Sequence, residues 1–284
     1  MKLKFKAALV ILTGVVFFYT ACKKTNQSPS NDGTVSLTVV SSQIAENIAQ
    51  SLSGAYGGVN ISNGLILPGF TTKFSASVSI GADLFDLCSF APDTVLSYST
   101  NIGDTIKSTT KGIFRFYFSC DTLKAPKING YSDYSLLNGY NAYDSLLTTG
   151  IAPRDSFIYN IKASYNVKAL DTVNIPLIIN GSSNKLLSVN GGLKSFVDAK
   201  AINKTVASAS VHAFYNLTGV TVDLTKNGDV TSGTATFNAT GSYNNVAWSN
   251  KGTVTFLGNN KANITIGTKT YNANLLTGIV TASN

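Results

Sequence analysis

The first hydrophobic period in the mature part of the chain is helical. Between residues 41 and 53, apolar residues recur at three- and four-residue spacing, which places them on one face of a helix. They are Ile44, Ala45, Ile48, Ala49 and Leu52. Ser41 or Ser42 can cap the start, and Gly54 supplies a stop. The pattern predicts one short helix over 41–53.

After Gly58 the period changes to two, which indicates β-strands. Early strands are predicted at 74–80, 113–118 and 173–179, the last weakened by Pro176. The C-terminal third alternates most regularly, and its predicted strands are 211–215, 220–224, 235–239, 254–256, 264–266 and 271–275. Turn residues separate these strands at 226–229, 249–252, 258–261 and 267–269.

Evenly spaced strands with short turns are typical of an antiparallel meander. We therefore expect a mainly β fold, a curled sheet or a sandwich, with one short N-terminal helix. We expect a single domain over 35–284, and a subdivision near residue 190 is the alternative because Asn190-Gly191-Gly192 resembles a turn. Between Cys120 and Ser156 the alternation lapses, which predicts a long loop.

Residues 1–21 have the pattern of a secretion signal. A basic start is followed by an apolar run from Ala7 to Tyr19 and by small residues before Cys22. A Cys in this place resembles the lipobox of bacterial lipoproteins of the Bacteroidota type, although that family usually has Leu where this chain has Tyr19. The resemblance implies that cleavage occurs before Cys22 and that its thiol carries diacylglycerol. An ordinary secretion signal is the alternative.

The resemblance also implies a location. The polar residues 22–34 then form a lipidated, flexible tether. Lys23 differs from the Asp that retains lipoproteins in the inner membrane, so we expect the protein to be anchored in the outer membrane. Its periplasmic face and its surface face are alternative locations. An exported chain favours a disulfide between Cys88 and Cys120. Two buried thiols or a metal pair are the alternatives.

The charge and the reactive residues of the chain exclude several classes of function. Only 13% of the residues are charged, and the net charge is +8. The lysines beyond Lys23-Lys24 are scattered singly and mark no site, so we expect no nucleic-acid partner. His212 is the sole histidine, which leaves no histidine-based metal site and makes a catalytic triad improbable. We expect no cofactor, no metal and no enzymatic activity; a glycan hydrolase using Asp83, Asp86 or Asp93 is the weak alternative.

A short motif recurs above chance. Asp followed by Ser or Thr and an aliphatic residue resembles the O-glycosylation sequon of exported Bacteroidota-type proteins. The hydroxyl residues that it would modify are Thr94, Thr105, Thr122, Ser145 and Thr172. The alternative is structural, because Asp before Thr at a strand entry forms an Asx-turn.

Tyrosines are dense where the alternation lapses. Tyr131, Tyr134, Tyr140 and Tyr143 lie among Asn, Gly and Ser, which suits a recognition loop for sugar or protein. The alternative is that these rings pack against the sheet edge.

The sequence thus predicts a non-catalytic, lipid-anchored protein of the cell envelope with a binding or structural role. Its partners are the membrane, through the lipid, and a glycan, protein or lipid ligand. One rival is a carrier of apolar ligands in a half-open barrel, which requires an apolar cavity under residues 41–53. The other is a fimbrial or adhesive subunit, which requires a donor strand or an exposed groove.

Overall fold

The computed structural model describes residues 34–52, 93–102, 106–120, 137–151, 155–169, 186–201, 208–226 and 229–283. Within them, helix α2 (Leu37–Leu52) precedes eleven strands. The strands are β1 (Asp93–Ile102), β2 (Ile106–Cys120), β3 (Leu137–Ile151), β4 (Asp155–Ala169), β5 (Leu186–Ala201), β6 (Ala209–Asp223), β7 (Asp229–Tyr243), β8 (Val246–Gly258), β9 (Lys261–Ile266), β10 (Lys269–Asn274) and β11 (Val280–Ala282). A 3₁₀ turn, η3 (Leu224–Lys226), follows β6.

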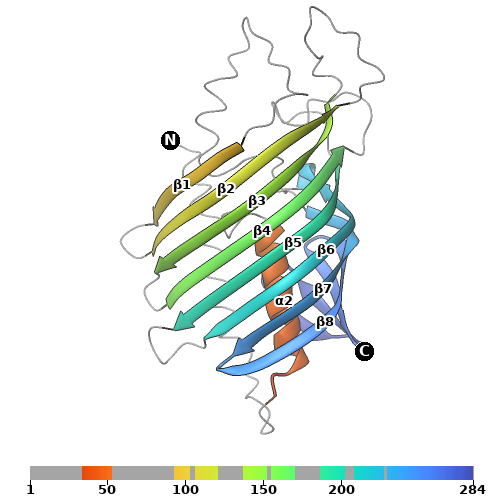
Figure 1. Cartoon of the computed structure of the whole chain (residues 1–284). Helices are drawn as coiled ribbons and strands as arrows, with labels where there is room; N and C mark the ends of the chain where they lie inside the picture. Colours follow the sequence, from red (N-terminus) through yellow and green to blue (C-terminus); the bar gives the residue numbers. More distant parts are fainter. Residues whose placement is uncertain are drawn as a thin grey trace, which may run out of the picture.

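All eleven strands belong to one antiparallel sheet whose order is the order along the chain. The mainly β meander predicted from the sequence is confirmed, and it takes the form of a curled sheet. Several strands of 15 residues reach about 50 Å, and the sheet coils so that its C-terminal strands bend around one side (Figure 1). Among the described residues β1 and β11 are its two edges.

Helix α2 lies in the hollow of this curl (Figure 1). It begins at Leu37, four residues before the predicted start, because Ser36 rather than Ser41 or Ser42 accepts the capping hydrogen bond, at 3.4 Å from the Val39 amide. Every residue from Val39 to Leu52 except Ala49 is buried.

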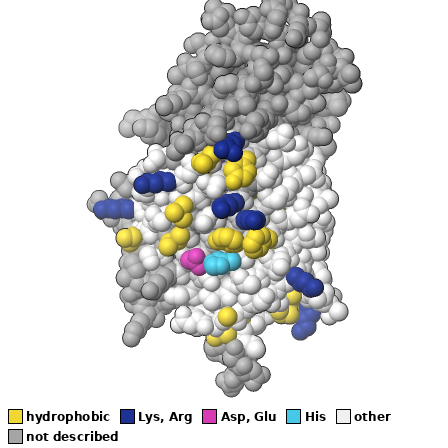
Figure 2. All heavy atoms as spheres, in the orientation of Figure 1, with side chains coloured by type: hydrophobic (Ala, Val, Ile, Leu, Met, Phe, Trp, Pro, Cys, Tyr) yellow, Lys and Arg dark blue, Asp and Glu magenta, His cyan; other side chains and the backbone are white. Residues whose placement is uncertain are grey.

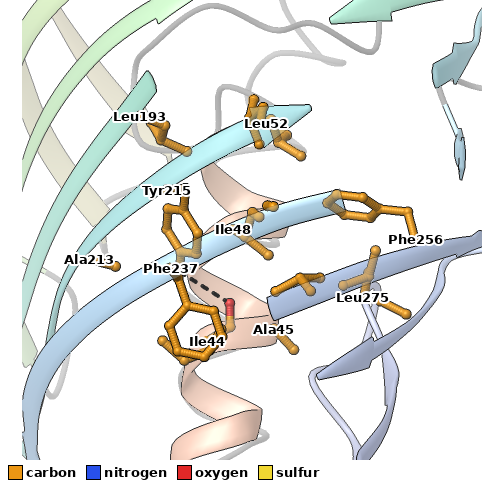
Figure 3. Close-up of a cluster of buried hydrophobic side chains, with 14 of the residues drawn as sticks. Ile44, Ala45, Ile48, Leu52, Leu193, Ala213, Tyr215, Phe237, Phe256 and Leu275 are labelled. Carbon is orange, nitrogen blue, oxygen red and sulfur yellow. Dashed lines mark hydrogen bonds between the residues drawn. The ribbon is translucent and has the colours of Figure 1, made fainter. Parts of the chain in front are cut away.

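The core forms where this helix meets the concave face of the sheet. Ile44, Ala45 and Ile48 are fully buried and belong to one cluster with residues of β5 to β10 (Figure 3). The sheet residues labelled there are Leu193, Ala213, Tyr215, Phe237 and Phe256, with Leu275 just beyond β10. Helix side chains therefore fill the concave side of the sheet along its C-terminal strands, from β5 onward.

β-Bulges interrupt the pairing of β5, β6 and β7 at neighbouring positions. The β5–β6 register shifts between Val189 and Gly191, and the β6–β7 register shifts after Thr218. Gly219 has φ +57°, and its amide donates a 2.7 Å hydrogen bond to the Asn190 side chain. The bulge joins the predicted strands 211–215 and 220–224 into one, β6. The alternative boundary near 190 coincides with it, and β5 continues across this point.

Asparagine pairs form the tight turns of the C-terminal hairpins. Asn259 and Asn260, both with positive φ, confirm the turn predicted at 258–261. The Asp229 carboxylate accepts hydrogen bonds from both of their amides, at 2.6 and 2.9 Å. Residues 267–268 also turn as predicted.

The turn predicted at 249–252 is wrong. These residues lie inside β8, and the chain turns instead at Asn244 and Asn245, which have φ +50° and +65°. Gly252 serves packing, since it pairs with Phe237 in register and leaves room for that ring. A glycine that makes room for an aromatic ring looks like a turn residue in the sequence.

The long loop predicted between Cys120 and Ser156 is wrong in its second half. Residues 137–151 form β3, and β4 begins at Asp155. The alternation is hidden because each face of β3 is mixed. Asp144 and Thr148 are buried, whereas Leu147 and Ile151 are exposed.

Gly252→Ala is expected to lower the free energy of unfolding by about 1–3 kcal/mol. An added Cβ would lie 2.8 Å from Cζ of Phe237 and against the backbone oxygen of Thr265. Gly192→Ala is the matched control, because that position in β5 has open space around it and an extended backbone. Urea unfolding measures both; equal losses would contradict the packing role given to Gly252.

Candidate functional site

Buried polar groups fix the helix in the concave side of the sheet. The Tyr215 hydroxyl donates to Oδ1 of Asn47 at 2.9 Å, and Nδ2 of Asn47 donates to Oγ of Ser195 at 2.9 Å. Ser51 donates to the same Ser195 oxygen at 3.0 Å. Tyr215 also reaches the Ile44 carbonyl at 3.5 Å (Figure 3). Burial raises the pKa of Tyr215, which keeps its hydroxyl protonated as the donor.

Glu46 is the titratable group of this interface. It is the only glutamate of the chain and is 3% exposed, and its Oε1 has no hydrogen-bond partner among the described residues. It packs against Gly278, whose φ is +64° and whose carbonyl accepts a 2.6 Å hydrogen bond from Ser42. Burial raises the pKa of Glu46 well above its usual value. Burial therefore favours the neutral form of this carboxyl where the helix packs against Gly278.

The other side of the sheet is available for contact with other molecules. We call it the outer face: the side chains of β2 to β8 that alternate with the buried ones. Figure 2 shows this side, with cationic and apolar side chains dispersed among neutral ones. The exposed cations of the outer face are Lys107, Lys111, Arg115, Lys162, Lys194 and Lys251. Asp198 is the one exposed carboxylate among its described side chains.

Register places the cations of β2 directly beside large apolar residues of β3. Lys107 pairs with Ile151, Lys111 with Leu147, and Arg115 with Tyr143. The Arg115 guanidinium carbon lies 5.9 Å from the centre of the Tyr143 ring. An aliphatic stem can cover an apolar neighbour while its charged end stays in water. This strip of the outer face is therefore both apolar and positively charged.

An aromatic cluster lies on β5 and β6 of the same face. Phe196 pairs in register with His212, with ring centres 5.2 Å apart, and meets Phe214 edge-on at 5.5 Å. Nζ of Lys194 lies 5.2 Å from the centre of the Phe214 ring, within the range of a cation–π contact. Phe214 remains 45% exposed, which leaves it accessible to a partner.

His212 takes part in an exposed pair with a carboxylate. Its Nε2 lies 2.9 Å from Oδ1 of Asp198, and both side chains are about half exposed. The Ser210 hydroxyl, two residues away on the same face, hydrogen-bonds to Ser242 at 2.9 Å. The geometry presents a hydrogen-bonded His–Asp pair on an open sheet surface, without a nucleophile hydrogen-bonded to the histidine in the described part of the chain.

The predicted modification sites fall mostly outside the described residues. Cys22, Cys88, Thr105, Thr122 and Thr172 all lie outside them, as do Asp83 and Asp86. Cys120 ends β2, and its predicted disulfide partner is not among the described residues. Thr94 lies near the start of β1, where the strand-entry explanation fits.

Ser145 is the modification candidate that the structure places best. It lies on the outer face in the middle of β3, so the strand-entry explanation does not apply to it. Its sequon neighbours Asp144 and Leu146 are both 1% exposed. An enzyme that reads this tripeptide must therefore act before β3 joins the sheet.

The predicted tyrosine loop separates into different environments. Tyr131 and Tyr134 lie outside the described residues, whereas Tyr140 and Tyr143 belong to β3. Tyr143 is 39% exposed on the outer face, and Tyr165 of β4 is buried in the core. Of these rings, Tyr143 is the one that the structure shows in a position to contact a partner.

The sequence missed the gathering of cations on this face. Lysines that are scattered along the chain come together because β2, β4 and β5 lie close in the sheet. One local signal was present, since residues 107, 111 and 115 follow a four-residue spacing that keeps side chains on one face of a strand.

The described residues contain no group of three or more His, Cys, Asp or Glu side chains that could hold a metal ion. No helix in the described ranges has the length and apolar character that a membrane span requires. Comparison of the chain with protein-family models, curated proteins and solved structures finds no match.

Glu46→Gln is expected to stabilise the protein at neutral pH. When the pKa of a carboxyl is higher in the folded state than in the unfolded state, the folded protein loses stability as the pH rises. The loss begins near the unfolded pKa of about 4.5 and ends near the folded pKa. The free energy of unfolding falls by about 1.4 kcal/mol for each unit by which the folded pKa exceeds the unfolded pKa. Glutamine fills the same space without ionising.

Urea unfolding at pH 4 and pH 7 measures this effect. The two proteins should agree at pH 4, where the carboxyl is protonated in both states, and the variant should be the more stable at pH 7. A variant that is less stable at pH 7 would show that the carboxylate is ionised and paired in the folded protein.

Proposed function

We propose that this protein is a non-catalytic, lipid-anchored component of the outer membrane that binds an envelope partner through the outer face of its sheet. The lipobox-like signal ending at Cys22 supports the location. The observation that carries the binding role is the contrast between the two sides of the sheet. Helix side chains fill the concave side from β5 onward, while the outer face presents cationic, aromatic and hydroxyl groups.

The carrier alternative receives less support from this arrangement. A carrier needs an apolar cavity of several hundred Å³ under the helix. Ile44, Ala45 and Ile48 are fully buried there against Phe237 and the neighbouring strands (Figure 3). To bind an apolar ligand in this place, α2 would have to leave the sheet and expose Glu46 and Asn47.

An adhesive or fimbrial role requires a strand or groove that a second chain can complete. Among the described strands the edges are β11, which is three residues long, and β1, which is ten residues long. A strand as short as β11 offers little backbone for pairing, whereas β1 is long enough to pair with a strand of a second chain. Strand pairing at β1 is therefore the second candidate for binding, beside the outer face.

Phe214→Ser tests the outer face as the binding surface. Phe214 is half exposed, so the change should leave the melting temperature nearly unchanged while removing an aromatic contact. We expect the mature protein, purified with its anchor from its own host, to be retained by the insoluble glycan and protein fraction of that host's envelope. The variant should be retained about tenfold less, equivalent to about 1.4 kcal/mol.

Leu276→Ser is the matched control, because Leu276 is 54% exposed and lies in the turn before β11, outside the outer face. It should be retained as well as the unmodified protein. Loss of retention in both variants, or in neither, would show that the outer face does not mediate binding.

A further inference from the structure

Two lysines of the outer face are held directly opposite each other. Lys162 of β4 pairs in register with Lys194 of β5, and both are exposed. Side chains at such positions have Cβ atoms about 4.5–5.5 Å apart, and like charges there destabilise the sheet. The register therefore places two like-charged side chains on neighbouring strands, with the Lys194 ammonium lying toward Phe214 of β6.

No described acidic group compensates this pair. The register neighbours of Lys162 and Lys194 on the adjoining strands are Ser145 of β3 and Phe214 of β6, which are uncharged. The one exposed carboxylate of the face, Asp198, lies four residues along β5 from Lys194 and is paired with His212. An unpaired lysine couple on an accessible surface has the charge that an anion requires.

Phe214 helps to position one of the two ammonium groups. The Lys194 Nζ lies 5.2 Å from the centre of its ring, which restricts where that flexible side chain extends. Ser145 and Ser164 lie next to Lys162 on the outer face, one across the strand pair and one along β4. Their hydroxyl groups can donate to and accept from a hydroxylated ligand.

Positive charge continues beyond the pair in both directions. Phe214 pairs with Asn238 and Asn238 with Lys251, so Lys162, Lys194 and Lys251 share one row across the sheet. Four strand spacings separate the ends of this row, about 19 Å. Lys111 and Arg115 lie on the other side of the pair, on β2. The charged track is longer than a single small anion and suits a polymer.

We propose that the Lys162–Lys194 pair and the cations around it bind an acidic polysaccharide of the cell envelope, whose carboxylate groups lie on the lysines and whose hydroxyls contact Ser145 and Ser164. The inference rests on the proposed function, since it names the partner of the same outer face. A membrane surface fits less well, because the face is convex and its exposed apolar residues alternate with polar ones (Figure 2).

The test compares binding of polygalacturonate oligomers and of neutral dextran to the mature full chain by titration calorimetry. We expect binding to polygalacturonate alone, and weaker binding as sodium chloride is raised. Lys162→Gln with Lys194→Gln should weaken it at least tenfold. The control, Lys226→Gln with Lys261→Gln, removes the same charge from exposed positions outside this track and should change binding less than twofold.

The melting temperature of Lys162→Gln distinguishes a role of Lys162 in binding from a role in the stability of the fold. Removing one member of a repelling pair should leave the melting temperature of Lys162→Gln unchanged or higher. A lower melting temperature would show that Lys162 supports the fold. If both double variants bind polygalacturonate equally weakly, binding depends on net charge alone, and the proposed site at Lys162 and Lys194 is wrong.

Two further outcomes separate the partner from the function. Lysine-dependent binding to phosphatidylglycerol vesicles, without binding to polygalacturonate, would replace the glycan by a lipid surface. If polygalacturonate is not bound but envelope retention still depends on Phe214, the acidic glycan is wrong and the proposed function stands. If polygalacturonate is not bound and envelope retention does not depend on Phe214 either, both proposals are wrong.

Discussion

The packing of α2 into the curl of the sheet is the interaction on which the rest of this structure depends. A single sheet with one apolar face has no second layer of its own, so that face must be covered. Ile44 and Ile48 cover it, and the Tyr215–Asn47–Ser195 hydrogen bonds fix the rotation of the helix. Because these polar groups satisfy one another only in this arrangement, they specify one position for the helix.

The same packing assigns different roles to the two sides of the sheet. Once the concave side is filled by the helix, strand alternation puts every second residue of β2 to β8 on an outer surface that the core does not need. Strand pairing then turns lysines that are far apart in the chain into one charged track. Lys162 and Lys194 are opposite each other in this track, and like charges at paired positions are a local conflict of the kind expected at a functional site.

The sequence predicted the fold well where one face of each strand is uniformly apolar. Val254, Phe256 and Ile264 alternate with polar residues and lie in β8 and β9, although β8 begins at Val246, before the turn that was predicted at 249–252. The prediction failed at β3, where Asp144 is buried and Leu147 is exposed. Because each face of this strand carries both polar and apolar residues, the sequence shows no alternation with a period of two. The cationic track could not be predicted, since it depends on the register between strands and not on any local run of charge.

The central claim is that α2 is an integral part of the core and that partners meet the outer face. Native-state hydrogen exchange of the full mature chain tests this most directly, because it gives an opening free energy for each buried amide. We expect the amides of Ile44 to Ile48 to open with the same free energy as those of β6 and β7. Much faster exchange in the helix alone would mean that α2 detaches while the sheet stays folded. The concave face would then be available to an apolar ligand, as the carrier alternative requires.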